Sequence, residues 1–134
     1  MRRRSIPLAQ PSLARTPAEP TPAPVPTKVG ILAEDANRRI LVVNDEFCRL
    51  FGIPVHPDRL YGYDCRRAAE EAKDLFEDPA GFLRGIERAL EAKQIVRGER
   101  LRLRDGRMLE RDYLPMPFGA GIHNLWQYRE IRDP

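Results

Sequence analysis

The stretch "GILAEDANRRILVVN", residues 30–44, decides the fold because it holds two apolar runs separated by a polar turn. Ile, Leu and Val dominate both runs, and the residues between them, 35–38, are Asp, Ala, Asn and Arg. Two short apolar runs joined by a tight polar turn are typical of a β-hairpin. We therefore expect two paired strands within residues 30–44.

Asn44 is expected to end the second of these strands and to begin a helix. Its side-chain oxygen can accept a hydrogen bond from a free amide in the first helical turn, and the acidic residues 45 and 46 lie near the positive end of the helix dipole. Phe47, Leu50 and Phe51 then share one helix face, and Gly52 follows as a stop. The sequence predicts a short helix after residue 44.

A stronger helix signal begins at Asp78, an N-cap residue that is followed by proline at the first helical position. Apolar residues recur at helical spacing through residue 90, which predicts a helix over about 79–94. A shorter helix rich in Ala and Glu is expected near 66–76.

The segment "ERLRLRDGRMLERDYLPM", residues 99–116, predicts a second hairpin, because Asp105-Gly106 is a pair that two-residue turns prefer. With that loop, Leu103 opposes Met108 and Leu101 opposes Glu110. The face that carries Leu101 would then also carry Glu110 and the acidic residue 112. Either these acids form a polar patch in a cavity or a bulge resets the register.

Pro115 and Pro117 are expected to end this strand, and residues 122–132 to form the last strand. Strands grouped at both ends of the chain, with helices between them, do not favour repeated parallel crossovers. We expect an α+β fold in which a five-stranded antiparallel sheet has its helices packed on one face.

Charge separates the first 28 residues from the rest of the chain. They hold seven of the 13 prolines, five of the 23 basic residues and one of the 20 acids, which leaves 18 basic and 19 acidic residues for 29–134. A near-neutral domain lacks the basic face that nucleic-acid binding needs. We expect residues 1–28 to be a disordered, Pro-rich basic tail and 29–134 to be one domain.

Other signals narrow the class of protein. No apolar run is long enough to span a bilayer and the tail lacks a secretory signal, so we expect a cytoplasmic protein. Cys48 and Cys65 suggest neither a disulfide framework nor a metal site. No catalytic triad or phosphate-binding glycine loop appears, so no catalytic residue and no enzymatic activity are expected.

The order and spacing of these pieces resemble the PAS domain family over residues 29–133, in the style of sensors from bacterial histidine kinases and cyclic-dinucleotide enzymes. Asn44 matches the asparagine that closes the second strand, and Gly62 matches the glycine of the short middle helix. Residues 130–132, Glu-Ile-Arg, stand where the family often has Asp-Ile-Thr. The resemblance implies a five-stranded antiparallel sheet, with helices around a small internal pocket, that serves in sensing or in pairing with a protein.

The resemblance also sets the expected partners. We expect a sensory and interaction module of bacterial two-component signal transduction that pairs as a homodimer or with a signalling protein, with an internal pocket for a small molecule. The chain has no kinase histidine box and no cyclase signature, so one alternative is a regulatory fragment of a histidine kinase or diguanylate cyclase.

A flavin- or haem-binding sensor is a further alternative. "GYDCR", residues 62–66, is similar to the Gly-x-Asn-Cys-Arg motif of LOV photoreceptors, but Asp64 replaces the asparagine and Gln127 lies one residue from the position of their final-strand glutamine. Haem-binding relatives carry a histidine on the long helix, where this chain has none; its histidines are His56 and His123. We therefore expect no cofactor.

Two sets of candidate residues follow from these predictions. The first is expected to line the ligand pocket, although apolar residues at these spacings also suit ordinary core: Phe51, Tyr61, Phe82, Ile86, Leu103 and Glu110. The second is expected on the sheet face opposite the helices, where an apolar patch marks an interface. Its members are Leu109, Tyr113, Trp126 and Tyr128.

Overall fold

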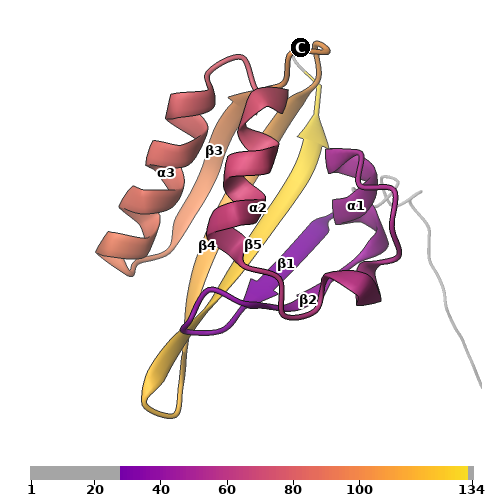
Figure 1. The fold of residues 1–134 in the computed structure, drawn as a ribbon. Coiled ribbons are helices and arrows are strands. Elements are labelled where there is room, and N and C mark those ends of the chain that lie inside the picture. Colours follow the sequence, from indigo (N-terminus) through magenta and orange to yellow (C-terminus); the bar gives the residue numbers. More distant parts are fainter. Residues whose placement is uncertain (1–27, 133–134) are drawn as a thin grey trace, which may run out of the picture.

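The computed structural model describes residues 28–132, so nearly all of the predicted tail lies outside the described residues. The five strands form one antiparallel sheet in the order β2-β1-β5-β4-β3 (Figure 1). The strands are β1 (Gly30–Glu34), β2 (Ile40–Val43), β3 (Val96–Arg102), β4 (Met108–Phe118) and β5 (Gly121–Ile131).

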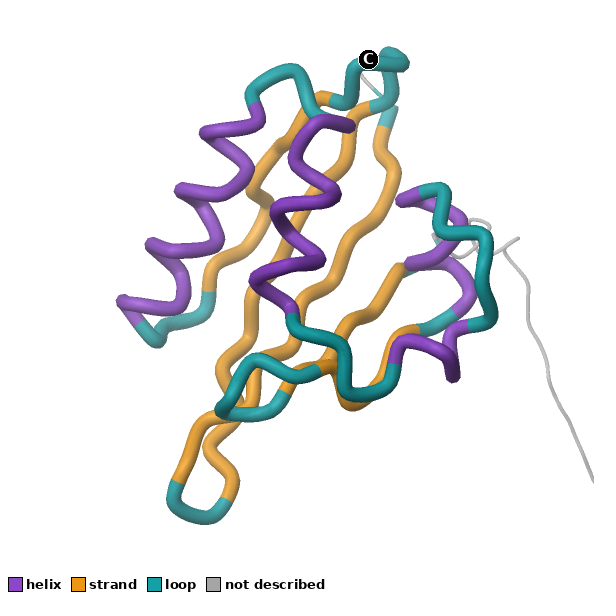
Figure 2. Tube along the Cα trace, in the orientation of Figure 1, coloured by secondary structure: helices purple, strands orange, loops and turns teal. Residues whose placement is uncertain are grey.

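The helices lie on one face of this sheet (Figure 2). They are α1 (Asp45–Phe51), α2 (Cys65–Ala72) and α3 (Pro79–Ala92), with the short 3₁₀ helices η2 (Pro57–Leu60) and η3 (Lys73–Leu75). The α+β fold expected from the sequence, an antiparallel sheet with helices on one face, is confirmed. None of the helices within residues 28–132 is long and apolar enough to cross a membrane.

The local helix signals are confirmed in their details. Asn44 Oδ1 accepts hydrogen bonds from the backbone N of Phe47 at 3.0 Å and from that of Ile31 at 2.9 Å, so one side chain caps α1 and ties it to β1. Asp78 caps α3 by accepting from the backbone N of Gly81 at 2.9 Å. The hairpin of β1 and β2 also forms as predicted.

The predicted register of the second hairpin is wrong by one residue. Leu101 pairs with Leu109, and Arg102 pairs with Met108. The backbone N of Leu103 donates to the carbonyl of Arg107 at 2.8 Å, which closes a three-residue loop, 104–106, in which the glycine has a φ of 97°. The extra loop residue moves every side chain of β4 to the opposite face of the sheet.

The prediction that Pro115 and Pro117 end the strand is also wrong. Strand β4 continues through both prolines to Phe118 and pairs with β5 along its whole length. Strand β3 joins β4 only as far as Tyr113, so among residues 28–132 the rest of β4 has a neighbouring strand on one side only. Proline has no backbone N–H to donate, so a strand tolerates it at an open edge, where no partner strand needs that donor. The β4–β5 hairpin therefore projects beyond the body of the domain (Figure 1).

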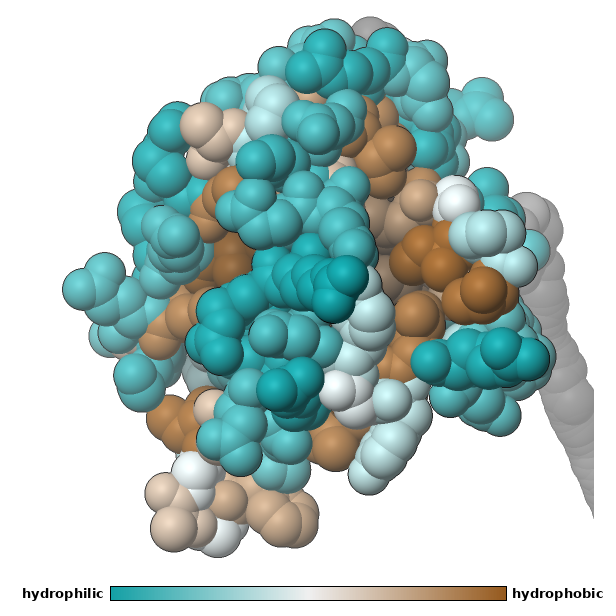
Figure 3. All heavy atoms as spheres, viewed as in Figure 1, coloured by the Kyte–Doolittle hydropathy of each residue, from teal (hydrophilic) through white to brown (hydrophobic). Residues whose placement is uncertain are grey.

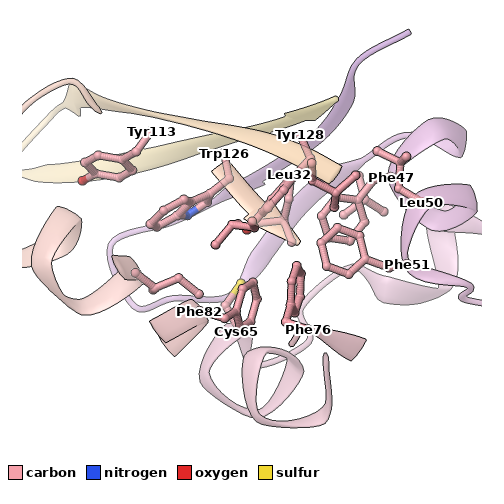
Figure 4. Close-up of a cluster of buried hydrophobic side chains, with 14 of the residues drawn as sticks. Leu32, Phe47, Leu50, Phe51, Cys65, Phe76, Phe82, Tyr113, Trp126 and Tyr128 are labelled. Carbon is pink, nitrogen blue, oxygen red and sulfur yellow. The ribbon is translucent and has the colours of Figure 1, made fainter. Parts of the chain in front are cut away.

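The four predicted interface residues lie on the wrong side of the sheet for that role. Trp126 and Tyr128 do share one face of β5, but this is the face that the helices cover, and both side chains are buried in the core. The register shift places Leu109 and Tyr113 there too, where they are buried. All four are buried, so they form no exposed patch. Figure 4 shows Tyr113, Trp126 and Tyr128 within the cluster of buried side chains.

Candidate functional site

A cavity of about 340 Å³ lies between the helices and the inner face of the sheet. Rings line much of it, from α1 (Phe47 and Phe51), from α3 (Phe82) and from β5 (Trp126 and Tyr128). Figure 4 shows these side chains converging from the sheet and the helices. Seen from the helix side, the surface is mostly hydrophilic, with hydrophobic residues visible between α1 and α2 (Figure 3).

The structure separates the predicted pocket residues into two groups. Phe51, Phe82 and Ile86 line the cavity, and their contact with a ligand stays a prediction. Tyr61 instead lies beside the outer strand β2 and is highly exposed, and Leu103 is buried in the core next to Phe76. The sixth residue, Glu110, lies on the opposite face of the sheet because of the register shift.

The polar centre of the cavity is Glu34, whose side chain is only 1% exposed. Its Oε2 accepts from Arg38 Nε at 2.6 Å and from Asn124 Nδ2 at 2.9 Å, and its Oε1 accepts from Trp126 Nε1 at 3.2 Å. The Tyr113 hydroxyl extends the network by donating to Asn124 Oδ1 at 2.6 Å. A buried carboxylate is tolerable when it is paired and hydrogen-bonded in this way.

The turn between β1 and β2 brings Arg38 to this carboxylate. Asp35 Oδ1 accepts from the backbone N of residues 37 and 39, at 2.9 and 3.0 Å, which fixes a compact Asx turn. Arg38 takes a φ of 63°, the left-handed conformation that tight turns use. Its side chain folds back over Glu34, four residues earlier, and also lines the cavity.

Cys65, at the start of α2, contributes a buried thiol to the cavity. Burial, together with the negative charge of the neighbouring Glu34 carboxylate, raises the pKa of Cys65 far above its ordinary value of 9.0. The thiol is therefore held protonated. Gln127, the other residue of the flavin alternative, pairs with Ile31 and Asp112 between two inward-facing neighbours, so its side chain points away from the cavity.

The raised pKa of Cys65 predicts a loss of stability in alkali. The unfolded state releases the thiol proton near pH 9 while the folded state keeps it, so stability present below pH 9 is lost as pH rises further. A difference of one bound proton between the folded and unfolded states changes the free energy of unfolding by about 1.4 kcal/mol per pH unit. We expect the free energy of unfolding, measured by urea titration between pH 9 and 10.5, to fall less steeply with pH in Cys65→Ala, by about that amount per pH unit. Equal slopes for the two proteins would contradict the assignment.

A second buried charge, Arg111, fastens α3 to the sheet. Its side chain is 1% exposed and binds Glu99 Oε1 through Nε at 3.0 Å and Nη2 at 2.8 Å. The guanidinium carbon lies 5.2 Å from the ring centre of Phe82 and 5.7 Å from that of Trp126. A Cβ on Gly85 of α3 would collide with this ion pair, so the glycine lets the helix approach it.

The outer face of the sheet carries a row of apolar side chains that no described helix covers. Cross-strand pairing aligns Val42, Ala33, Leu125 and Leu114 across β2, β1, β5 and β4. Val42 is 55% exposed, and the other three are partly exposed. On the same face Arg129 binds Glu110 at 2.7 Å and Asp112 at 3.0 Å. We call Val42, Ala33, Leu125 and Leu114 the outer row.

Residues 28–132 hold no group of three or more His, Cys, Asp or Glu side chains placed to bind a metal ion. His56 accepts from the backbone N of Asp58 at 3.1 Å, and His123 stacks on Phe118 with ring centres 4.8 Å apart. Neither histidine lines the cavity.

Sequence reasoning missed Glu34, Arg38 and Arg111 as parts of the site. One signal was present for Glu34, because it follows positions 30 and 32 at strand spacing and so belongs to the buried face of β1. Arg111 offered no local signal, since its face depended on the length of the preceding loop.

No family model and no curated protein sequence matches the chain. A domain of an HTR-like protein from Haloarcula marismortui is 21% identical with a TM-score of 0.54, over 78% of this chain and 98% of that one. A domain of a protein proposed to be a light and redox sensing histidine kinase, from the same organism, is 14% identical with a TM-score of 0.57, over 79% and 91%. The PAS domain of the fruit-fly ELK potassium channel is 16% identical with a TM-score of 0.53, over 76% and 85%.

Proposed function

The chain has the fold of a PAS domain, and from this premise we propose that it is a sensory and protein-interaction module of the kind used in bacterial signal transduction. It takes a small molecule into the cavity and passes the change to a protein bound on the outer face of the sheet. No chemical step by the chain itself is part of the proposal.

The observation that carries the proposal is the position of β5 between the two surfaces. Trp126 and Tyr128 of this central strand line the cavity, while Leu125 of the same strand belongs to the outer row. A ligand that favours one packing of the inner rings therefore acts on the same strand that presents the outer row. Its effect is limited to its difference in affinity for the two packings.

We propose that the protein bound on the outer face is a second copy of the chain. An apolar row flanked by charged residues has the arrangement of an interface core and rim. Both signs of charge lie beside the row, with Arg129 next to Glu110 and Asp112, so a two-fold axis can bring opposite charges together. Closed two-fold dimers are the commonest soluble oligomers, and their surfaces are self-complementary in this way.

Sedimentation velocity over a range of protein concentrations tests this interface. We expect the wild-type chain to dimerise, and Val42→Ser combined with Leu125→Ser to weaken the dimer at least roughly tenfold. Ile95→Ser is the matched control, because Ile95 is 59% exposed but lies outside the sheet, before β3. A wild-type chain that stays monomeric, or a double variant that dimerises as well as the wild type, would refute the interface.

A further inference from the structure

The cavity holds charged groups whose balance constrains a ligand. Its lining includes two carboxylates, Glu34 and Glu71, and one guanidinium, Arg38. Glu34 already accepts from three nitrogen donors, which uses most of the acceptor capacity of a carboxylate. Glu71 is exposed at the rim, where it accepts from the Tyr63 hydroxyl at 2.6 Å. The carboxylates are therefore poor partners for a further donor, and they repel an anion.

Arg38 differs from them because it has hydrogen-bonding capacity left. Only its Nε donates to Glu34, and its two terminal nitrogens donate to no acceptor within residues 28–132. The side chain is 15% exposed and lines the cavity. Since Glu34 already balances its charge, Arg38 offers N–H donors without a free positive charge. A buried anion would need a free positive charge to offset its lost hydration, which Arg38 does not supply, so an uncharged acceptor such as a carbonyl oxygen suits these donors better.

The remaining walls favour a flat apolar body. Five rings, of Phe47, Phe51, Phe82, Trp126 and Tyr128, line the cavity, and its volume is at the small end of the range for ligand pockets. Resting on the proposed function, we propose that the cavity binds an uncharged aromatic molecule whose carbonyl oxygen accepts hydrogen bonds from Arg38. An aromatic acid and a plain hydrocarbon of the same shape bind more weakly.

Three probes of nearly equal shape separate these cases: 2-acetylnaphthalene, which is a neutral ketone, 2-naphthoate, which is an anion, and 2-ethylnaphthalene, which has no acceptor. Trp126 is the single tryptophan of the chain, so its indole N–H resonance identifies occupancy of the cavity without assignment of other residues. In NMR titrations we expect the ketone to bind roughly tenfold more tightly than the hydrocarbon, as one hydrogen bond from the guanidinium gives. The acid is expected to bind more weakly than the ketone.

Variants link the preference to Arg38. Arg38→Met alone would leave Glu34 buried without its cation, so it is combined with Glu34→Gln, which removes the buried charge and keeps one oxygen acceptor, for Asn124 or for Trp126. We expect this double variant to bind the ketone and the hydrocarbon equally. Arg67→Met is the control, because Arg67 is exposed at the rim and pairs with Glu71 at 3.5 Å; it should keep the preference for the ketone.

The possible results are distinct. Equal binding of the three probes, or tightest binding of the acid, overturns the proposed ligand class and leaves the proposed sensory function standing. Preference for the ketone that survives in the double variant overturns the role of Arg38. If no probe moves the Trp126 resonance, the ligand class is wrong and ligand sensing by the cavity loses its support, whatever the sedimentation experiment gives for the outer row.

Discussion

Replacement of Arg111 by alanine is expected to lower the free energy of unfolding by about 3–5 kcal/mol, the range observed when one partner of a buried ion pair is removed. Glu99 would lose both of its hydrogen bonds to the guanidinium, and the carbonyl of Phe82 would lose a nearby donor. The rings of Phe82 and Trp126 would also face an empty volume where the guanidinium now lies. The loss is measurable by urea denaturation followed through Trp126 fluorescence.

Two controls separate packing from charge at this position. Arg111→Met fills the volume without the charge, and we expect it to be less damaging than alanine, because apolar replacements of buried ion pairs are often tolerated. Arg84→Ala on α3, where the side chain is 58% exposed, should change the unfolding free energy by less than about 0.5 kcal/mol. An alanine at 111 that cost no more than the one at 84 would show that Arg111 does not fasten α3.

Replacement of Glu34 by alanine is expected to cost a similar amount, about 3–5 kcal/mol. The carboxylate is the common acceptor for Arg38, Asn124 and Trp126, and its removal leaves three buried or half-buried donors without their partner. Each unsatisfied buried donor costs about 1–3 kcal/mol. Because these donors come from the turn between β1 and β2 and from β5, we also expect the β1–β2 hairpin to loosen from the sheet.

The matched variant is Glu34→Gln, which keeps an oxygen acceptor and should lose less stability than alanine. Glu87→Ala on the exposed side of α3 controls for the loss of a carboxylate in general and should be close to neutral. Amide hydrogen exchange of β2 reports the loosening directly. If exchange of β2 were unchanged in Glu34→Ala, the network would not anchor the hairpin.

Sequence reasoning succeeded where the determining interaction is local. Asn44 and Asp78 each cap a helix by accepting from an amide three residues later, so the short local sequence is enough to predict the contact. The order of strands and helices was likewise enough for the antiparallel sheet. The register of the second hairpin failed because Asp105-Gly106 suits a two-residue loop, while the chain forms a three-residue loop there.

The candidate site was less predictable because its polar residues meet across the sheet. Asn124 and Trp126 bind Glu34 from 90 and 92 residues away in sequence, so no local pattern marks the three as a group. A charged side chain in a strand is normally expected to face solvent, but those of Glu34 and Arg111 are buried. Trp126 and Tyr128 show the opposite error: the alternation put them on one face correctly, but only the packed helices determine which face is buried.

Pro115 and Pro117 remove backbone hydrogen-bond donors from the projecting end of β4 and leave its acceptors, which affects how the protein behaves at high concentration. Along that open flank the chain can offer carbonyl oxygens, but the two imino nitrogens cannot donate, so an incoming strand finds no complete ladder to extend. Stacking of molecules into fibrils through this flank is thereby discouraged, although the hairpin tip is apolar. Contacts made by the tip must then rely on its side chains, because the backbone there cannot extend a sheet.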